Sequence, residues 1–385
     1  MSNSPRIRIG MVGGGVGAGI ATAHRAAMHL DDRYLLVAGA FSRDAERNRQ
    51  SAEQLHVAPE RVYSDYAEMA RAEAAREDGI EVVTIVTPNA SHYAISKAFL
   101  EQGIHVICDK PMTDDLAQAL ELQQLAASTG QIFALTHNYS AYAMVRKAAE
   151  MVRSGALGEL RIVQGEHSSG WAAGDVEDQP DNKQAAWRID PQQAGENSMV
   201  LDLGTHIHHL VRYVTGREVE SLSATLNTVV PGRRVFDDGE ISLRLSGNLR
   251  GGIWISMAAT GQEHGLRLRI FGSKASLEWR HEEPNRLVIQ YLDGHKEIIV
   301  QGQQGLDGEA ARLTRIGLGH PEGFLEGFAN LYGDIADAIE DFRYTHRVPR
   351  EGQRFPSTDD GVAGLRFVSA VRKSHDQQSA WTEVQ

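Results

Sequence analysis

The sequence contains one cysteine, Cys108, among 385 residues. No internal disulfide can form, which is usual for proteins of the reducing cytoplasm. No stretch approaches the roughly 20 consecutive apolar residues that a membrane helix needs, and residues 1–8 lack the apolar segment of a secretory signal. We therefore expect a cytoplasmic protein that has no membrane partner.

Positive charge is also scarce in this chain. Lys and Arg number 39 against 51 Asp and Glu, which gives a formal net charge of −12. An acidic chain does not attract phosphate backbones or anionic lipids, so we expect no nucleic-acid partner. Hydrophobic residues (42%) and charged residues (23%) occur in the proportions of an ordinary globular protein. The length is sufficient for two domains.

Residues 1–138 alternate short apolar runs with helical patterns. The predicted strands are continuously apolar and cover 7–12, 34–41, 81–86, 104–108 and 131–135. Thr113 is the predicted N-cap of the helix between the last two strands. Continuously apolar strands that alternate with helices are typical of a doubly wound parallel sheet. We therefore predict an α/β domain over residues 1–138.

Residues 139–385 show a different rhythm, in which short runs alternate apolar and polar residues. These runs cover 160–167, 220–228, 241–247, 252–258, 266–271, 275–279, 286–291 and 296–300. The alternation predicts an α+β domain with an open, largely antiparallel sheet that has one wet face. A long amphipathic helix follows at 324–342. The segment 168–198 has little periodicity, and a loop of this length is either a lid over a site or a plain surface excursion.

The first predicted strand runs into a glycine-rich turn that a helix follows. The turn matches the dinucleotide-binding pattern G-x-G-x-x-G/A at Gly13, Gly15 and Ala18. The first glycine permits the tight turn, the second lets the backbone approach a pyrophosphate, and the small third residue lets the helix pack on the strand. We therefore predict a Rossmann domain that binds a dinucleotide through Gly13, Gly15, Val16 and Ala18.

The end of the second predicted strand selects the cofactor in domains of this kind. An acidic residue there binds the ribose hydroxyls of NAD, whereas an arginine accepts the 2′-phosphate of NADP. Ser42 and Arg43 are suited to a phosphate, and Asp44 is close enough in sequence to reach a hydroxyl. These residues leave both cofactors open; we expect NAD, with NADP as the alternative.

The predicted strand at 104–108 ends in the segment Cys108-Asp109-Lys110-Pro111. Open α/β sheets bind their ligands in the crevice beyond the carboxyl ends of the strands. Lys110 therefore brings a positive charge to the edge of the sheet where a ligand is expected.

Three further motifs accompany the glycine turn. They are Thr87-Pro88-Asn89 with His92, the tripeptide Asp109-Lys110-Pro111, and Asp202-x-x-x-His206. Together they resemble the glucose–fructose oxidoreductase/inositol dehydrogenase (Gfo/Idh/MocA) family over nearly the whole chain, with Asp-Lys-Pro in place of the family's E-K-P. The resemblance is strongest to members that oxidise ring hydroxyls of pyranoses and cyclitols, such as scyllo-inositol, L-glucose or levoglucosan dehydrogenases. It implies an NAD(P)-dependent oxidoreductase with a substrate-binding and oligomerisation domain at 139–385, which assembles as a homodimer or homotetramer.

The chemistry that the resemblance implies needs two groups. Removing a hydride from a secondary alcohol requires a base for the hydroxyl proton and a positive group that holds the oxygen. The resemblance makes His206 the general base, Asp202 its partner or a substrate ligand, and Lys110 the group that binds the hydroxyl. Asp202 and His206 lie four residues apart in a predicted helix at 199–214, so they share one face.

The resemblance also assigns residues to the cofactor and to the substrate. Cofactor contacts are implied for Thr87, Pro88, Asn89, His92, Asp109, Lys110 and Asn138. Softer candidates for the substrate, each equally explained by packing or surface exposure, are Asn138, Tyr142, Trp187, Arg188 and His320. A metal site is not expected, because His206, His208 and His209 do not all share one helix face, zinc needs three or four convergent ligands, and family members of this kind work without metal.

Two departures from the family pattern lie where the pocket is built. Asp109 is one methylene shorter than the usual Glu, which changes how the lysine is held. Residues Gly195-Glu196-Asn197-Ser198 replace a glycine-rich approach to the helix that carries Asp202. For these reasons we do not infer the substrate or the oxidised carbon from any relative.

Two other functions stay open at this point. One is an NAD-dependent glycoside hydrolase that oxidises its substrate transiently. The other is a non-catalytic protein that senses a sugar or a nucleotide, although the joint presence of Lys110, Asp202 and His206 argues against it.

Overall fold

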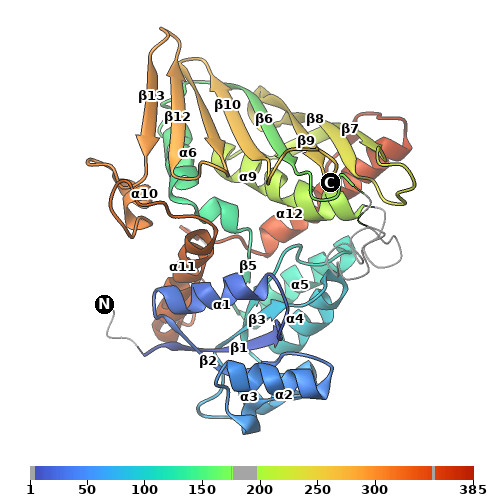
Figure 1. Ribbon diagram of the computed structural model, residues 1–385, viewed down its shortest axis with the longest axis vertical. Coiled ribbons are helices and arrows are strands. Elements are labelled where there is room, and N and C mark those ends of the chain that lie inside the picture. Colours follow the sequence, from blue (N-terminus) through green and yellow to red (C-terminus); the bar gives the residue numbers. More distant parts are fainter. Residues whose placement is uncertain (1–4, 175, 177–196, 349–351) are drawn as a thin grey trace. The chain divides into compact units, whose positions relative to one another are not determined.

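The computed structural model describes residues 5–174, 176, 197–348 and 352–385 (Figure 1). Trp187, Arg188 and most of the segment 168–198 lie outside the described residues, so the hypothesis of a lid stays a prediction.

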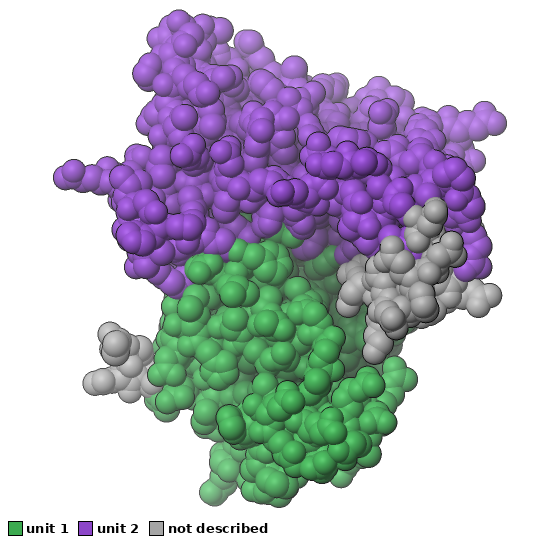
Figure 2. All heavy atoms as spheres, viewed as in Figure 1, with its two compact units in different colours: residues 1–141, 324–363 green, residues 142–323, 364–385 purple. Residues whose placement is uncertain are grey.

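The chain divides into two compact units, which Figure 2 colours separately. Unit 1 contains Met1–Ala141 and Phe324–Ala363, and unit 2 contains Tyr142–Gly323 and Gly364–Gln385. We expected a single boundary after residue 138. The structure differs because residues 324–363 return to unit 1.

Unit 1 is built on a five-stranded parallel sheet. Its strands are β1 (Ile7–Gly13), β2 (Tyr34–Ala40), β3 (Val82–Val86), β4 (His105–Cys108) and β5 (Phe133–Leu135). Their order is β2-β1-β3-β4-β5, and every pairing is parallel. The doubly wound fold is therefore confirmed. Its topological switch point lies between β1 and β3, where sheets of this order bind nucleotides beyond the carboxyl ends of the strands.

Helices connect the strands of this sheet (Figure 1). They are α1 (Ala21–Leu30) after β1, α2 (Ala45–Gln54) and α3 (Tyr66–Ala74) after β2, α4 (His92–Leu100) after β3, and α5 (Leu116–Thr129) after β4. We did not predict α3, because its buried face consists of Met69, Ala70 and Glu73 and gives little apolar signal.

The predicted N-cap of α5 was wrong. Asp115 caps this helix, since its carboxylate accepts a hydrogen bond from Gln118 N (2.9 Å). Thr113 lies two residues earlier, and the hydrogen bond of its hydroxyl is to the carbonyl oxygen of Asp115 (2.7 Å) and not to a helix amide.

The long helix α11 (Phe324–Thr345) completes unit 1, which confirms the predicted helix at 324–342. Its residues Phe328, Leu331 and Ile335 are buried in the same core as Ile7 and Ile9 of β1. Burying a side chain of this size contributes about 1.5–3 kcal/mol. A segment distant in sequence therefore supports the central strand of the sheet.

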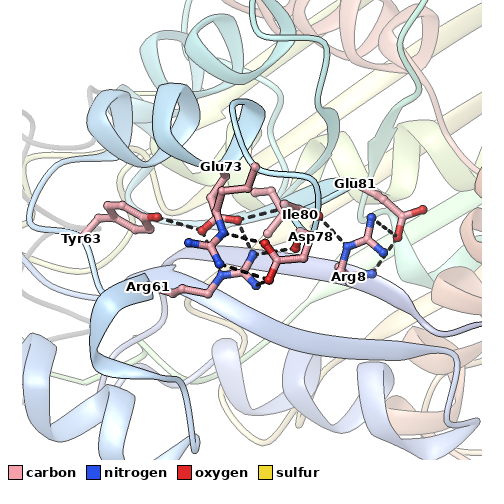
Figure 3. Close-up of polar contacts among 9 residues, drawn as sticks. Arg8, Arg61, Tyr63, Glu73, Asp78, Ile80 and Glu81 are labelled. Atoms are coloured by element: carbon pink, nitrogen blue, oxygen red, sulfur yellow. Dashed lines mark hydrogen bonds and ion pairs between the residues drawn. The ribbon is translucent and has the colours of Figure 1, made fainter.

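A buried ion pair fixes the region between β2 and β3 (Figure 3). Arg61 Nε donates to Glu73 Oε1 (3.1 Å), and a second guanidinium nitrogen of Arg61 bonds to Glu73 Oε2. Tyr63 Oη (2.8 Å) and Ile80 N (3.2 Å) donate to the same carboxylate. Burial and the Glu73 carboxylate raise the pKa of Tyr63 to about 12. A buried charge with this many partners is stable only while the set is complete.

Unit 2 is built on a nine-stranded mixed sheet. Its strands are β6 (Leu160–Ser168), β7 (Val219–Asn227), β8 (Asp238–Leu245), β9 (Arg250–Ser256), β10 (Leu266–Gly272), β11 (Ala275–Arg280), β12 (Arg286–Tyr291), β13 (Lys296–Val300) and β14 (Thr382–Glu383). Their order is β13-β12-β11-β10-β6-β9-β8-β7-β14, and only the β6–β9 pair is parallel. The predicted, largely antiparallel sheet is confirmed.

Helices α6 (Ala143–Arg153) and α9 (Thr205–Thr215) pack on one face of this sheet (Figure 1). The other face carries a cross-strand row that runs through β6, β10, β11, β12 and β13, namely Gln164, Arg269, Glu278, Val288 and Ile298. These side chains are half-buried or exposed, so this face is wet, as the alternating pattern indicated. In this part of the chain we did not predict α6, α10 (Gly308–Arg312) or α12 (Thr358–Asp376). None of the described helices is long and apolar enough to cross a membrane.

Candidate active site

The glycine turn after β1 is packed too closely for side chains. Gly13 has φ +79°, and a Cβ there would lie 2.7 Å from the carbonyl oxygen of Val86. A Cβ on Gly15 would lie 2.9 Å from the carbonyl oxygen of Phe41 and 3.0 Å from Ser51 Oγ. The turn is thus wedged between the ends of β2 and β3, at the switch point of the sheet.

The other side of this turn is open. Val16 is 45% exposed, and a Cβ on Gly17 would meet no atom within 4 Å. No side chain caps the N-terminus of α1; Thr22 N and Ala23 N bond to the carbonyl oxygens of Gly19 (3.3 Å) and Ile20 (2.9 Å), and this end of the helix carries the positive end of its dipole. A glycine cradle in front of an uncapped helix fits the pyrophosphate of a dinucleotide.

The turn after β2 is held by Asn48, a buried residue of α2 that sequence reasoning missed. Asn48 Oδ1 accepts from Phe41 N (2.8 Å) and Ser42 N (3.3 Å), and its Nδ2 donates to the carbonyl oxygen of Tyr63 (2.8 Å). A lone Asn in a polar helix carries no sequence signal for this role.

The two charged residues that follow Ser42 have different surroundings. Asp44 caps α2 by accepting from Arg47 N (2.8 Å), so its carboxylate is engaged within its own turn. Arg43 is exposed at the carboxyl end of β2.

His92 connects the Thr87-Pro88-Asn89 turn to the Lys110-Pro111 segment. Its Nδ1 lies 2.8 Å from the carbonyl oxygen of Pro111, and its Nε2 lies 2.9 Å from that of Thr87. Because both partners are acceptors, both ring nitrogens donate, which requires the imidazolium form. Burial opposes this charge, but the Cys108 sulfur, the Pro111 carbonyl and the Asp109 carboxylate outweigh it and raise the pKa of His92 to about 9.

Asp109 holds the other side of the lysine. Its Oδ1 accepts from the Lys110 amide (2.9 Å) and from Thr136 Oγ1 (2.6 Å), and lies 3.9 Å from His24 Nε2. Burial opposes ionisation, but His24, Thr136 and the Lys110 charge outweigh it and hold the pKa of Asp109 well below its usual range. The shorter side chain is thus anchored by two residues, His24 and Thr136, that sequence reasoning did not single out.

Asn138 begins the short helix η3 (Asn138–Ala141) directly after β5 and is buried. Its amide donates to the carbonyl oxygen of Thr136 (2.8 Å). Unit 1 therefore brings the glycine turn, Thr87, His92, Lys110 and Asn138 to the carboxyl edge of one sheet.

In unit 2, Asp202 and His206 lie on one continuous helical segment. The segment begins with a π-helical turn, η5 (Val200–Gly204), and continues as α9. We predicted an ordinary helix over 199–214, and the π turn is the difference. Such turns are rare and are frequent at functional sites. Asp202 is half-buried, and His206 is buried with 8% of its surface exposed.

Three histidines that we did not single out extend from His206 in a row of ring contacts. The ring centroids of His206 and His167 are 5.9 Å apart, those of His167 and His264 are 4.8 Å apart, and those of His264 and His281 are 4.3 Å apart. His167 Nδ1 also lies 3.2 Å from the carbonyl oxygen of Leu203, within the π turn. The histidines are far apart in sequence, so spacing gave no signal for this row.

The other histidines of α9 do not face a common point with His206. His208 stacks on Phe367 with ring centroids 4.4 Å apart. Burial, with the charges of Arg212 and Arg146, lowers the pKa of His209 to about 3. Among the described residues, no group of three or more His, Cys, Asp or Glu side chains could hold a metal ion.

The softer substrate candidates of unit 2 differ in exposure. Tyr142 is buried, and its ring contacts Trp279 with centroids 5.5 Å apart. His320 is exposed, and its Nδ1 lies 3.3 Å from the carbonyl oxygen of Gly317.

Comparison with known proteins decides the family. A model of the oxidoreductase family with an NAD-binding Rossmann fold matches residues 7–137, and the GFO/IDH/MocA C-terminal domain matches residues 145–278. YfiI, an uncharacterised oxidoreductase of Bacillus subtilis, is 34% identical over 383 residues, which cover 99% of this chain and 97% of YfiI. The chain belongs to the GFO/IDH/MocA family of oxidoreductases. The resemblance carried by the motifs is confirmed.

Solved structures of this oxidoreductase family extend the comparison. An inositol dehydrogenase homolog from Azotobacter vinelandii complexed with NAD⁺ matches with a TM-score of 0.94 and 34% identity, covering 99% of this chain and 98% of that one. The homolog complexed with NADH and myo-inositol gives 0.92 and 33% at the same coverage. Levoglucosan dehydrogenase of Pseudarthrobacter phenanthrenivorans is 24% identical over 79% of this chain and 80% of that enzyme. Unit 1 of this oxidoreductase is an NAD-binding Rossmann domain, so the cofactor prediction is confirmed.

Proposed function

We propose that this oxidoreductase removes a hydride from a ring secondary hydroxyl of a sugar or cyclitol and yields a keto-sugar or keto-inositol. The observation that carries the proposal is the anchoring of Lys110 at the carboxyl edge of the NAD-binding sheet. The Asp109 carboxylate binds the Lys110 amide, and His92 binds the carbonyl oxygen of Pro111. An ammonium based there suits an alcohol oxygen that gains negative charge. The inositol dehydrogenase homolog with myo-inositol and levoglucosan dehydrogenase support a ring polyol as the substrate class.

Bound NAD supplies the hydride acceptor. We propose that Lys110 binds the substrate hydroxyl and that a ring nitrogen of His206 accepts its proton. Asp202 orients either His206 or the substrate. His206 is largely shielded from bulk water, and hydrogen bonds in such surroundings are stronger than in water. Each of these roles follows from the family likeness together with the side-chain chemistry.

We also propose the cofactor and substrate ligands at the level of residues. The glycine turn at Gly13, Gly15, Val16 and Ala18 holds the pyrophosphate, and Ser42 with Arg43 contacts the adenosine ribose. The exposed Arg43 is able to contact the 2′-phosphate of NADP, so NADP is the alternative cofactor, and NAD is the preferred one. Thr87, Pro88, Asn89, His92, Asp109 and Asn138 line the nicotinamide side. Asn138, Tyr142, Trp187, Arg188 and His320 remain candidates for the substrate.

The wet face of the unit 2 sheet is the proposed contact for a homo-oligomer. Ile162 of β6 and Trp254 of β9 are 47% and 36% exposed on this face. Arg269 of β10 pairs with Glu166 of β6 (2.7 Å), and Arg267 of β10 pairs with Glu278 of β11 (3.0 Å). Apolar side chains among mixed charges suit a self-complementary contact. We propose that the enzyme is cytoplasmic, because a chain with a single cysteine forms no internal disulfide and so does not depend on an oxidising compartment.

A panel of sugars and cyclitols that differ at one carbon tests the proposal, with NAD⁺ and NADP⁺ supplied separately. We expect NADH formation with at least one ring polyol, and loss of activity with its epimer at the oxidised carbon. No reduction of either cofactor across the panel would contradict a dehydrogenase. Glycoside cleavage without net NADH would instead identify the transient-oxidation hydrolase, and binding without any turnover would identify a sensor.

A further inference from the structure

A buried polar chain runs through unit 1 behind the Asp109-Lys110-Pro111 segment. His24 of α1 is fully buried, and its Nδ1 lies 2.8 Å from Tyr332 Oη of α11. The Tyr332 hydroxyl also lies 2.9 Å from Thr84 Oγ1 of β3. The other ring nitrogen of His24, Nε2, faces Asp109 Oδ1 at 3.9 Å. The chain thus connects β3, α11 and α1 to the carboxylate that precedes the lysine.

The hydrogen-bond roles along this chain are constrained. When His24 is neutral with its proton on Nε2, Tyr332 donates to Nδ1 and Thr84 donates to Tyr332. When His24 is charged, Nδ1–H donates to Tyr332 and Tyr332 donates to Thr84. In both cases an N–H of His24 points at the Asp109 carboxylate, and the hydroxyls of Tyr332 and Thr84 only reverse direction.

We propose that His24, Tyr332 and Thr136 are positioning residues that fix the Asp109 carboxylate and through it the backbone from which Lys110 extends. The proposal rests on the function proposed above. Thr136 donates to Asp109 Oδ1 at 2.6 Å, and the same oxygen accepts the Lys110 amide at 2.9 Å. A rotation of the carboxylate therefore releases its hydrogen bond to the peptide that enters Lys110.

This arrangement accounts for aspartate at a position where the family pattern has glutamate. The side chain of Asp109 is short enough to accept a hydrogen bond from the amide of the next residue, Lys110. Thr136, which follows β5, donates to the same oxygen, and His24 of α1 faces it. Side chains that orient a reacting group in this way typically change rates by about 10–100-fold when removed.

The structure supplies a matched control for Tyr332. Tyr34 is also fully buried, its ring contacts that of Tyr332 with centroids 5.4 Å apart, and its hydroxyl donates to the Tyr332 carbonyl oxygen (2.8 Å). Tyr34→Phe and Tyr332→Phe each remove one buried hydroxyl from the same core. Only the Tyr332 hydroxyl is bonded to His24.

The test compares Tyr332→Phe, Tyr34→Phe, Thr136→Val and Thr136→Ser in the full-length protein. The first readout is kcat and KM with the polyol found by the panel. The second is the pH midpoint at which an amine-reactive reagent modifies Lys110 in the cofactor-free protein, followed by peptide mass spectrometry. The second readout needs no substrate, so it decides the inference even if the panel finds no activity.

We expect Tyr332→Phe and Thr136→Val to lower kcat about 10–100-fold with little change in KM for NAD⁺. Thr136→Val also shifts the Lys110 midpoint by about half a pH unit or more, because the released carboxylate no longer holds the peptide that enters Lys110. Thr136→Ser restores both values, and Tyr34→Phe changes neither. An unchanged Lys110 midpoint in Thr136→Val, or a kcat in Tyr332→Phe equal to that in Tyr34→Phe, would overturn the inference.

Discussion

His92 Nδ1 lies 2.8 Å from the carbonyl oxygen of Pro111, the residue directly after Lys110. The bond spans from the start of α4 to the end of β4, and its partner bond to Thr87 spans to the end of β3. One buried imidazolium therefore joins two of the loops at the carboxyl edge of the sheet.

This bond predicts a loss of stability in alkaline solution. The pKa of His92 is raised from 6.5 to about 9, so its contribution is complete below pH 6.5 and is lost as the pH rises through about 9. The shift corresponds to about 3 kcal/mol. We expect the free energy of unfolding, measured by denaturant titration, to fall over this range. His92→Gln removes most of that slope, whereas the exposed His29→Gln leaves it in place; equal slopes in all three proteins would contradict the assignment.

A second buried histidine predicts the opposite behaviour in acid. Ile132 N donates to His105 Nδ1 (3.1 Å), and burial lowers the pKa of His105 to about 4. Its contribution is therefore present above pH 6.5 and is lost as the pH falls toward 4. We expect His105→Gln to reduce the acid-side loss of stability by up to about 3 kcal/mol. His281, whose pKa burial and His264 lower to about 4, accounts for part of the loss that remains.

The motif residues of unit 1 and the residues that hold them in place were not equally predictable from the sequence. The motif residues of unit 1 were predictable, because a parallel sheet brings the carboxyl ends of its strands to one edge wherever they lie in the chain. The residues that hydrogen-bond to the motifs or face them, such as His24 and Tyr332, were not predictable. His24 sits in an apolar helix stripe and Tyr332 lies in a helix far along the chain, and neither periodicity nor spacing relates them to Asp109.

The division into units shows the same limit. The amphipathic pattern at 324–342 correctly predicted a helix with a buried face, but such a pattern does not say which core receives that face. Phe328 and Ile335 pack beside Ile7 and Ile9, so the segment belongs to unit 1. The π turn that carries Asp202 could not be predicted from the sequence either, because one extra residue in a helical turn leaves the pattern of apolar residues almost unchanged.

The Arg61–Glu73 pair predicts a large structural effect that is separate from catalysis. Glu73→Gln leaves the buried Arg61 guanidinium facing only the exposed Asp78 carboxylate at 3.7 Å, and removing one partner of a buried ion pair typically costs about 3–5 kcal/mol. The exposed pair of Arg49 and Glu53 is the control, and Glu53→Gln is expected to leave the free energy of unfolding nearly unchanged. Thermal and denaturant unfolding of both variants provide the measurement. Equal losses in both would show that burial does not set the strength of the Arg61–Glu73 pair.

The glycine turn predicts a binding defect. A Cβ on Gly15 would meet Phe41 O at 2.9 Å, so Gly15→Ala displaces the turn from the end of β2. We expect the Kd for NADH, measured by fluorescence titration, to rise at least about tenfold, which corresponds to about 1.4 kcal/mol. Gly333→Ala is the control: it lies in α11 with no atom within 4 Å of the new methyl group. It should leave the Kd unchanged and stabilise the helix by about 0.5–1 kcal/mol. An unchanged Kd in Gly15→Ala would place the pyrophosphate elsewhere.

The most direct test of the account compares the unmodified enzyme with Lys110→Met, which keeps the length of the side chain and removes its charge. NADH formation is followed with the polyol that the panel identifies, and NADH binding is measured separately on both proteins. We expect the variant to bind NADH within about threefold of the unmodified enzyme and to lose at least about 10³-fold in kcat. Turnover within about tenfold of the unmodified enzyme would contradict the central role of Lys110.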